Sequence, residues 1–141
     1  DARRDGVKKA LATQGNVQLV ASLPGDWDRS KALDVANTIL QRNPDLKAIY
    51  AANDGMALGA LQAVKNANKL GKVMVIGTDG VPEAIDSVKR GELTATAAQD
   101  SAGMGAKALD VMITTLKNKP AIKVDAAPAF VAVDSQIVSK D

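Results

Sequence analysis

The chain alternates between two kinds of hydrophobic pattern. Short apolar runs, typical of buried strands, occupy residues 17–23, 48–51, 73–76 and 93–98. Apolar residues recur at helical spacing in 3–14, 29–42, 56–64, 82–90 and 101–117, and two short segments near the end, 130–133 and 136–138, have an extended pattern. Strands and helices that alternate at such short spacing predict an α/β fold with a mostly parallel sheet and helices on both faces.

The segment 47–67 is the clearest of these units. Its apolar run is followed by Asn53, Asp54 and a glycine, and then by apolar residues at helical spacing. We expect a buried strand, a tight turn and a helix capped by Asp54, whose carboxylate can accept free amides of the first turn. Asn53 would then follow the carboxyl end of a strand, where small ligands bind in open α/β sheets. Residues 78–80 form a similar turn, either as a repeated unit or as ordinary turn chemistry.

Composition narrows the possible chemistry. The length of 141 residues suits one domain, 46% of them are hydrophobic, and a net charge of +2 with interspersed signs argues against a nucleic-acid partner. The sequence has no Cys and no His, which removes thiol nucleophiles, the usual general base and the usual transition-metal ligands. It also has no phosphate-binding loop and no dinucleotide-binding glycine motif, so we expect no cofactor and no metal.

Polar or aromatic side chains follow several of the predicted strands. Trp27, Asn53, Asp79 and Gln99 each come after an apolar run, and Arg3 begins the first helix. Planar amide, carboxylate and guanidinium groups can each make paired hydrogen bonds to neighbouring hydroxyls of a sugar. An indole face can cover the apolar C–H surface of a pyranose. Together these residues predict a sugar site.

Each candidate also has an ordinary explanation. Trp27 could cover the edge of the core, Asn53 could be a turn residue, and Asp79 could cap a helix or form a turn. Gln99 and Arg3 could be solvated surface residues. The functional prediction therefore depends on the whole set lying at one edge of the sheet.

An enzyme is the weaker prediction. A glycosidase needs two carboxylates beside the glycosidic bond, and Asp54 with Asp79 could supply them. Nothing in the sequence raises the pKa of either one for an acid role, so we expect no catalysis.

A set of motifs gives the sequence a specific resemblance. They are Ala2-Arg3-Arg4 with Gly6, residues 25–29 (GDWDR), 52–54 (AND) with 56–59 (MALG), 77–80 (GTDG), and 94–96 (TAT) running to Gln99. Over its whole length the chain resembles the C-terminal half of periplasmic sugar-binding proteins of ABC importers, in the ribose/D-allose-binding group and most of all its allose-binding members. The resemblance implies a flavodoxin-like lobe of the periplasmic binding protein type I fold. Residues 1–99 would form most of the sugar-binding lobe, and 100–141 the crossover helix and the C-terminal hinge and tail segments.

The resemblance also implies a function. It is non-catalytic binding of an allose- or ribose-type monosaccharide in the periplasm, for uptake through the membrane subunits of an ABC transporter. Arg3, Trp27, Asn53, Asp79 and Gln99 match the residues that contact sugar in the family. The alternative is the effector-binding domain of a lactose-repressor-type regulator, which shares the fold.

The resemblance further predicts that the fold is incomplete at its N-terminus. A parallel α/β sheet usually starts with a strand, whereas this chain starts with a predicted helix. We therefore expect a fragment without the N-terminal lobe and without the preceding strand. The apolar face of the helix 101–117 then needs another partner, either the sheet of the same chain or a second copy.

Overall fold

A computed structural model describes residues 2–118 and 130–140. It divides into two compact units, Asp1–Ala98 with Ile137–Asp141, and Gln99–Gln136. The first unit contains most of the sheet and the hydrophobic core, whose side chains come mainly from α2 (Arg29–Arg42), α3 (Asp54–Asn66) and the strands.

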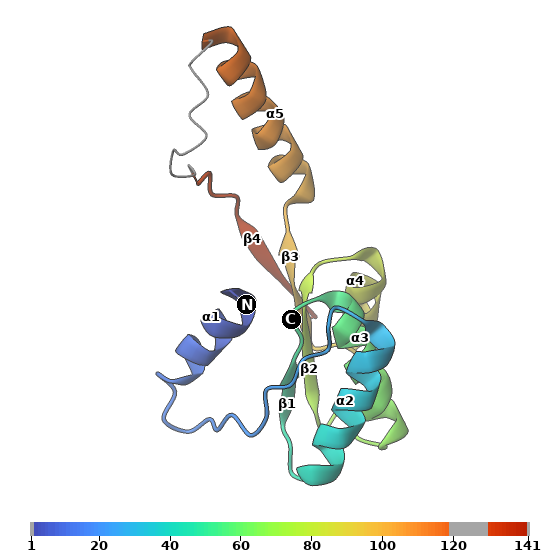
Figure 1. Cartoon of the computed structure of the whole chain (residues 1–141). Helices are drawn as coiled ribbons and strands as arrows, with labels where there is room; N and C mark the ends of the chain where they lie inside the picture. The colour runs from blue at the N-terminus through green and yellow to red at the C-terminus, as the bar shows by residue number, and fades with distance from the viewer. Residues whose placement is uncertain (1, 119–129, 141) are drawn as a thin grey trace. The chain divides into compact units, whose positions relative to one another are not determined.

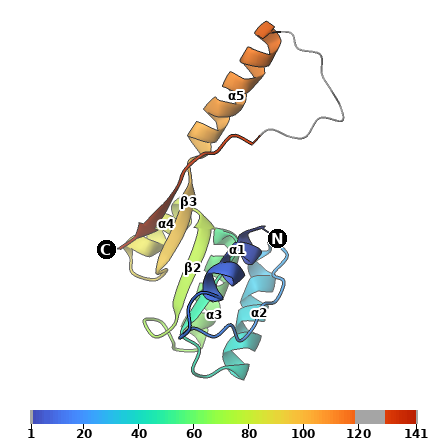
Figure 2. The ribbon, with the colours of Figure 1, turned by 90° about the vertical axis from the view of Figure 1, so that its left-hand side faces the viewer.

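The sheet has the order β1-β2-β3-β4, with β1 (Ala48–Tyr50), β2 (Met74–Asp79), β3 (Ala95–Gln99) and β4 (Ser135–Ser139). β1 pairs with β2 and β2 with β3 in parallel, and the connections contain α3 and α4 (Pro82–Lys89). Figure 1 shows α2, α3 and α4 on one side of β1 and β2 and α1 (Ala2–Leu11) on the other, and Figure 2 shows the same sheet with α1 toward the viewer. The α/β prediction is confirmed.

Packing of α2 against α3 forms the centre of the core. Ala57, Ala63 and Val64 of α3 are fully buried. Gly59 lets the two helix backbones come close, since a Cβ built there would overlap the carbonyl oxygen of Arg29.

The described helices include none with the length and hydrophobicity that a membrane span requires.

The helix caps agree with the sequence in one place and differ in another. Asp28 caps α2 as expected, because its carboxylate accepts the amide of Lys31 at 2.6 Å. The predicted cap of α3 is wrong, since Asn53 and not Asp54 fills that position, with its Oδ1 accepting the amide of Met56 at 2.7 Å. Asp54 is already inside the helix, and its carboxylate is buried in the protein interior.

The predicted strand at 17–23 is absent. Val17, Leu19, Val20 and Leu23 are each about half exposed, at 48–51%. The sheet order β1-β2-β3-β4 does not include residues 17–23, so this run pairs with no strand within the described part of the chain. An apolar run with β propensity still needs a hydrogen-bonding neighbour to become a strand. Near the C-terminus, residues 130–133 are likewise irregular, and the strand there is β4.

The second unit contains the helix α5 (Ser101–Asn118). Asp100 caps its start, with the carboxylate accepting the amide of Gly103 at 2.8 Å. No residue of α5 is buried. Its large apolar side chains are 38–66% exposed, and they are Met104, Leu109, Val111, Met112, Ile113 and Leu116.

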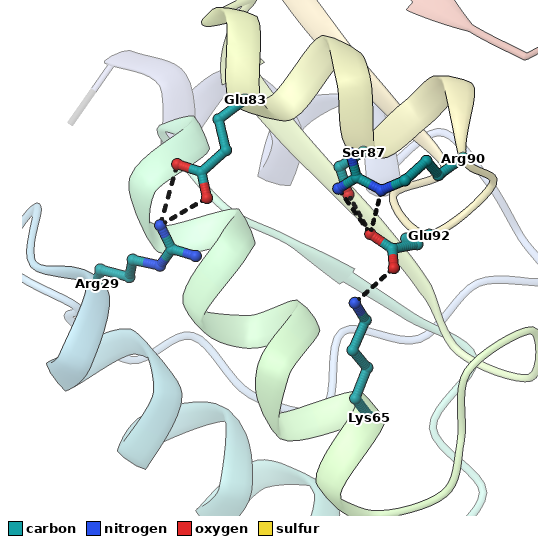
Figure 3. A network of polar contacts seen from close by, with 6 residues as sticks. All are labelled: Arg29, Lys65, Glu83, Ser87, Arg90 and Glu92. Carbon is teal, nitrogen blue, oxygen red and sulfur yellow. Dashed lines mark hydrogen bonds and ion pairs between the residues drawn. The ribbon is translucent and has the colours of Figure 1, made fainter.

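A group of ion pairs joins the helices of the first unit (Figure 3). Glu92 accepts hydrogen bonds from Lys65 of α3 at 2.7 Å and from Arg90 at 2.9 Å. These two hydrogen bonds lower the pKa of Glu92 from 4.5 to about 2, and the bond from Lys65 has the larger effect. Arg29 and Glu83 connect α2 to α4 at 2.9 Å.

Candidate ligand-binding site

Three of the predicted site residues follow the carboxyl ends of neighbouring strands. Asn53 comes shortly after β1, Asp79 is the last residue of β2, and Gln99 is the last residue of β3. Because these strands are parallel, their carboxyl ends lie at one edge of the sheet, which we call the rim. Gln99 also begins the second unit, so its place in a common site stays a prediction.

Arg3 connects the first helix to the rim. Its Nη1 donates to the carbonyl oxygen of Ala52 at 2.7 Å, and its Nη2 donates to Oδ1 of Asp79 at 2.7 Å. The side chains of Arg3 and Asp79 are 33% and 30% exposed, so the pair is accessible from solvent. Arg4 instead pairs with its neighbour Asp5 at 2.8 Å.

Trp27 lies beside this pair. The guanidinium carbon of Arg3 is 5.8 Å from the centre of the Trp27 ring, within the range of a cation–π interaction. Trp27 is 61% exposed, which is against the alternative that it covers the edge of the core. Its φ of 63° and the 48° of Asp26 are both in the left-handed region, which is costly for a bulky residue and is often found at ligand sites.

Asn53 and Asp79 also take part in the turns that follow their strands. Asn53 caps α3 with its side-chain Oδ1. Its side-chain nitrogen Nδ2 makes no hydrogen bond within the described part of the chain, so the two N–H donors on Nδ2 can face a ligand. Asp79 does not cap α4, because the cap position is Val81 and has no side-chain bond. Asp79 has a φ of 123° and is followed by Gly80 at 73°.

Sequence reasoning missed the residues behind the rim. The buried carboxylate of Asp54 accepts hydrogen bonds from the amide of Val81 at 2.8 Å and from the Thr96 hydroxyl at 2.7 Å. The available signal was Gly77, because a glycine inside an apolar strand often marks close approach of another group. A Cβ at Gly77 would overlap Oδ1 of Asp54.

Within the described ranges, no group of three or more His, Cys, Asp or Glu residues could hold a metal ion.

Comparison with known proteins decides the family. A model of the periplasmic binding protein domain matches residues 1–120. The chain belongs to this family. Its members include the D-allose-binding periplasmic protein of Escherichia coli, which is 53% identical over 140 residues, or 99% of this chain and 45% of that protein. The ribose import binding protein RbsB of Salmonella typhimurium is 43% identical over 83% of this chain and 39% of its own length.

Solved structures of the family have the same fold. A periplasmic solute-binding protein of an ABC transporter from Actinobacillus succinogenes, with bound D-allose, superposes with a TM-score of 0.86. It is 39% identical, and the match covers 97% of this chain and 47% of that protein. The chain therefore spans about half the length of the relatives it matches. The periplasmic-binding-protein lobe predicted from the motifs is confirmed, whereas these relatives give no support to the regulator alternative.

Proposed function

We propose that the rim is one half of a non-catalytic binding site for an allose- or ribose-type monosaccharide. The observation that carries this proposal is the contact of Arg3 with both Asp79 and Trp27. It brings a guanidinium, a carboxylate and an exposed indole together at one edge of the sheet. Paired polar groups suit vicinal hydroxyls, and an indole suits the C–H face of a pyranose.

The hydrogen bonds of the carboxylates support binding without catalysis. Asp54 is fully buried, and its two oxygens accept from Val81 and Thr96. It therefore cannot reach a glycosidic bond, and Asp79, the second carboxylate of the hydrolase alternative, is ion-paired with Arg3. A glycosidase needs two carboxylates that face the scissile bond from opposite sides, and this pair does not fit that need. The relatives support the same conclusion, because their names describe binding proteins.

The wider role follows from the family. We infer that the protein to which this chain belongs acts in the periplasm and delivers its sugar to the membrane subunits of an ABC transporter. Two names support this inference: the E. coli relative is called a periplasmic protein, and the A. succinogenes relative is called a periplasmic solute-binding protein of an ABC transporter. Since the chain covers 45% of the E. coli relative, the other half of the site would come from an N-terminal lobe or from a second copy.

A fluorescence titration tests the proposal. Trp27 is the only Trp in the sequence, so its emission reports on the rim alone. D-allose and D-ribose should each bind weakly and produce a saturable change in the emission of Trp27. Arg3→Gln should weaken binding about tenfold, as expected when a charged hydrogen bond to the ligand is lost. The control is Arg42→Gln at the last residue of α2, which should bind as the wild type does. Equal affinity in all three proteins would contradict the proposed site.

A further inference from the structure

A buried polar cluster lies directly behind the rim. Asp54 and Thr96 are both fully buried, and the Thr96 hydroxyl donates to Oδ1 of Asp54 at 2.7 Å. Burial of a carboxylate is unfavourable unless hydrogen bonds replace its contacts with water. The site described above does not use either side chain, so their place in the interior needs another reason.

The other hydrogen bonds of the cluster lead to the turn after Asp79. The amide of Val81 donates to Oδ2 of Asp54 at 2.8 Å. The amide of Gly80 donates to the Thr96 hydroxyl oxygen at 3.2 Å. The two backbone amides that follow Asp79 are thus held by side chains from α3 and β3.

The backbone of this turn is in an unfavourable conformation. Asp79 has a φ of 123°, which residues with a side chain rarely adopt, and Gly80 follows at 73°. A side chain at Gly80 would overlap Ala98, so the turn lies tightly against β3. Such a conformation persists only where the surrounding structure holds it in place. Among the described residues, Thr96 and Asp54 are the only side chains that accept hydrogen bonds from the amides of Gly80 and Val81.

We propose that Asp54 and Thr96 are positioning residues for Asp79. They hold the turn so that the carboxylate of Asp79 faces Arg3 and the ligand side of the rim. Neither group touches the ligand, because both are buried beneath the turn. The proposal rests on the proposed function in one respect, that Asp79 contacts the monosaccharide.

A purely structural role is the alternative, and the chain offers a matched control for it. Glu92 also forms a charged cluster in the first unit, with Lys65 and Arg90. Within the part of the chain that the structure describes, the hydrogen bonds of Glu92 go to Lys65, Ser87 and Arg90 and not to the turn at 79–81. Glu92→Gln should therefore lower stability and leave the turn unchanged.

The experiment compares Thr96→Val, Asp54→Asn and Glu92→Gln with the wild-type chain. Urea unfolding first shows that each variant is folded and how much stability it loses. NMR then measures the amide-to-Hα coupling of Asp79, which depends on φ, and the exchange rates of the Gly80 and Val81 amides. A Trp27 fluorescence titration gives the affinity for D-allose. Because Val is nearly isosteric with Thr, Thr96→Val should fold even if Asp54→Asn does not.

In Thr96→Val and Asp54→Asn we expect the small coupling at Asp79 to rise toward that of ordinary extended backbone. Exchange of the amide that loses its acceptor should become at least about tenfold faster, and affinity for D-allose should fall about tenfold, with no such changes in Glu92→Gln. An unchanged coupling and affinity in folded Thr96→Val would overturn the proposal, as would equal changes in Glu92→Gln. If the wild type binds no sugar, the proposed function fails, and the coupling alone decides whether the cluster positions Asp79.

Discussion

At the scale of single residues, the rim differs from the rest of the first unit in its backbone. The non-glycine residues described with positive φ are Asp26, Trp27, Asn68 and Asp79. Asp79 ends β2 at the rim, and Asp26 precedes Trp27, whose ring lies beside Arg3. The sequence identified Trp27 and Asp79 as candidates by their positions after apolar runs. The sequence could not show their backbone conformation, because only Gly adopts a positive φ readily enough for the residue type to indicate it. It also mistook buried Asp54 for a cap, since Asn53 and Asp54 both have side chains suited to that role.

Asp79 should matter for affinity in a complete site. We expect Asp79→Ala to weaken sugar binding by about 1.5–3 kcal/mol in a two-lobe version of the protein, because it removes a charged hydrogen-bond acceptor. Calorimetry with D-allose measures the change. Asp86→Ala, which removes an exposed carboxylate from α4, is the control and should leave affinity as it is. If Asp79→Ala also left affinity unchanged, Asp79 would be a turn residue only.

Glu92 gives a prediction about pH. Its pKa is lowered from 4.5 to about 2 by hydrogen bonds from Lys65 and Arg90. A carboxylate whose pKa is lower in the folded state stabilises that state above its unfolded pKa, and this contribution is lost as pH falls through the folded value. The stability difference between wild type and Glu92→Gln should thus be full above about pH 4.5 and shrink toward pH 2. Urea unfolding at several pH values measures it, and a constant difference from pH 6 to 3 would refute the assignment.

At the scale of elements, helices were easier to predict than strands. α2 begins after Asp28 and ends at Arg42 as the cap and the apolar spacing indicated, because both signals are local. The apolar run 17–23 shows the opposite case, since whether it becomes a strand depends on a neighbour that its own sequence does not specify. The parallel order of β1, β2 and β3 followed from the helices between them, and that order is what places Asn53 and Asp79 on one rim.

The contact between α2 and α3 should be sensitive to a single methyl group. Gly59→Ala should destabilise the protein by about 1–3 kcal/mol, because the new Cβ would overlap backbone atoms of α2 that cannot move independently. Gly6→Ala in α1 is the control, since nothing lies within 4 Å of its Cβ position. It should be neutral or slightly stabilising through helix propensity. Chemical denaturation compares the two variants, and equal stabilities would contradict this view of the helix contact.

At the scale of the whole molecule, α5 presents apolar side chains without burying any of them. Exposed apolar patches of this kind usually mark an interface. We expect the isolated chain to self-associate through this face, since a second copy supplies an identical apolar surface. Light scattering should show a dimer or larger species for the wild type and a monomer for Val111→Lys. A wild-type monomer at concentrations near 100 µM, a range in which micromolar association would be evident, would refute this expectation.

The isolated chain should also bind sugar weakly. One lobe leaves its ligand open to water, so each hydrogen bond exchanges with solvent for little net gain. Loss of about three contacts at roughly 1–1.5 kcal/mol each corresponds to about two to three orders of magnitude in affinity. Saturable binding in the micromolar range or tighter would show that one lobe is enough.

The location of the site on the rim is tested most directly by NMR titration of the isotope-labelled chain with D-allose. We predict that weak binding shifts the indole signal of Trp27 and the amides of Asn53 and Asp79, all with one dissociation constant. Amides at the opposite ends of the strands, such as those of Lys47 and Lys72, should remain unchanged. Shifts confined to those opposite ends, or no shifts at about 50 mM sugar, where even a millimolar complex is nearly saturated, would contradict the account.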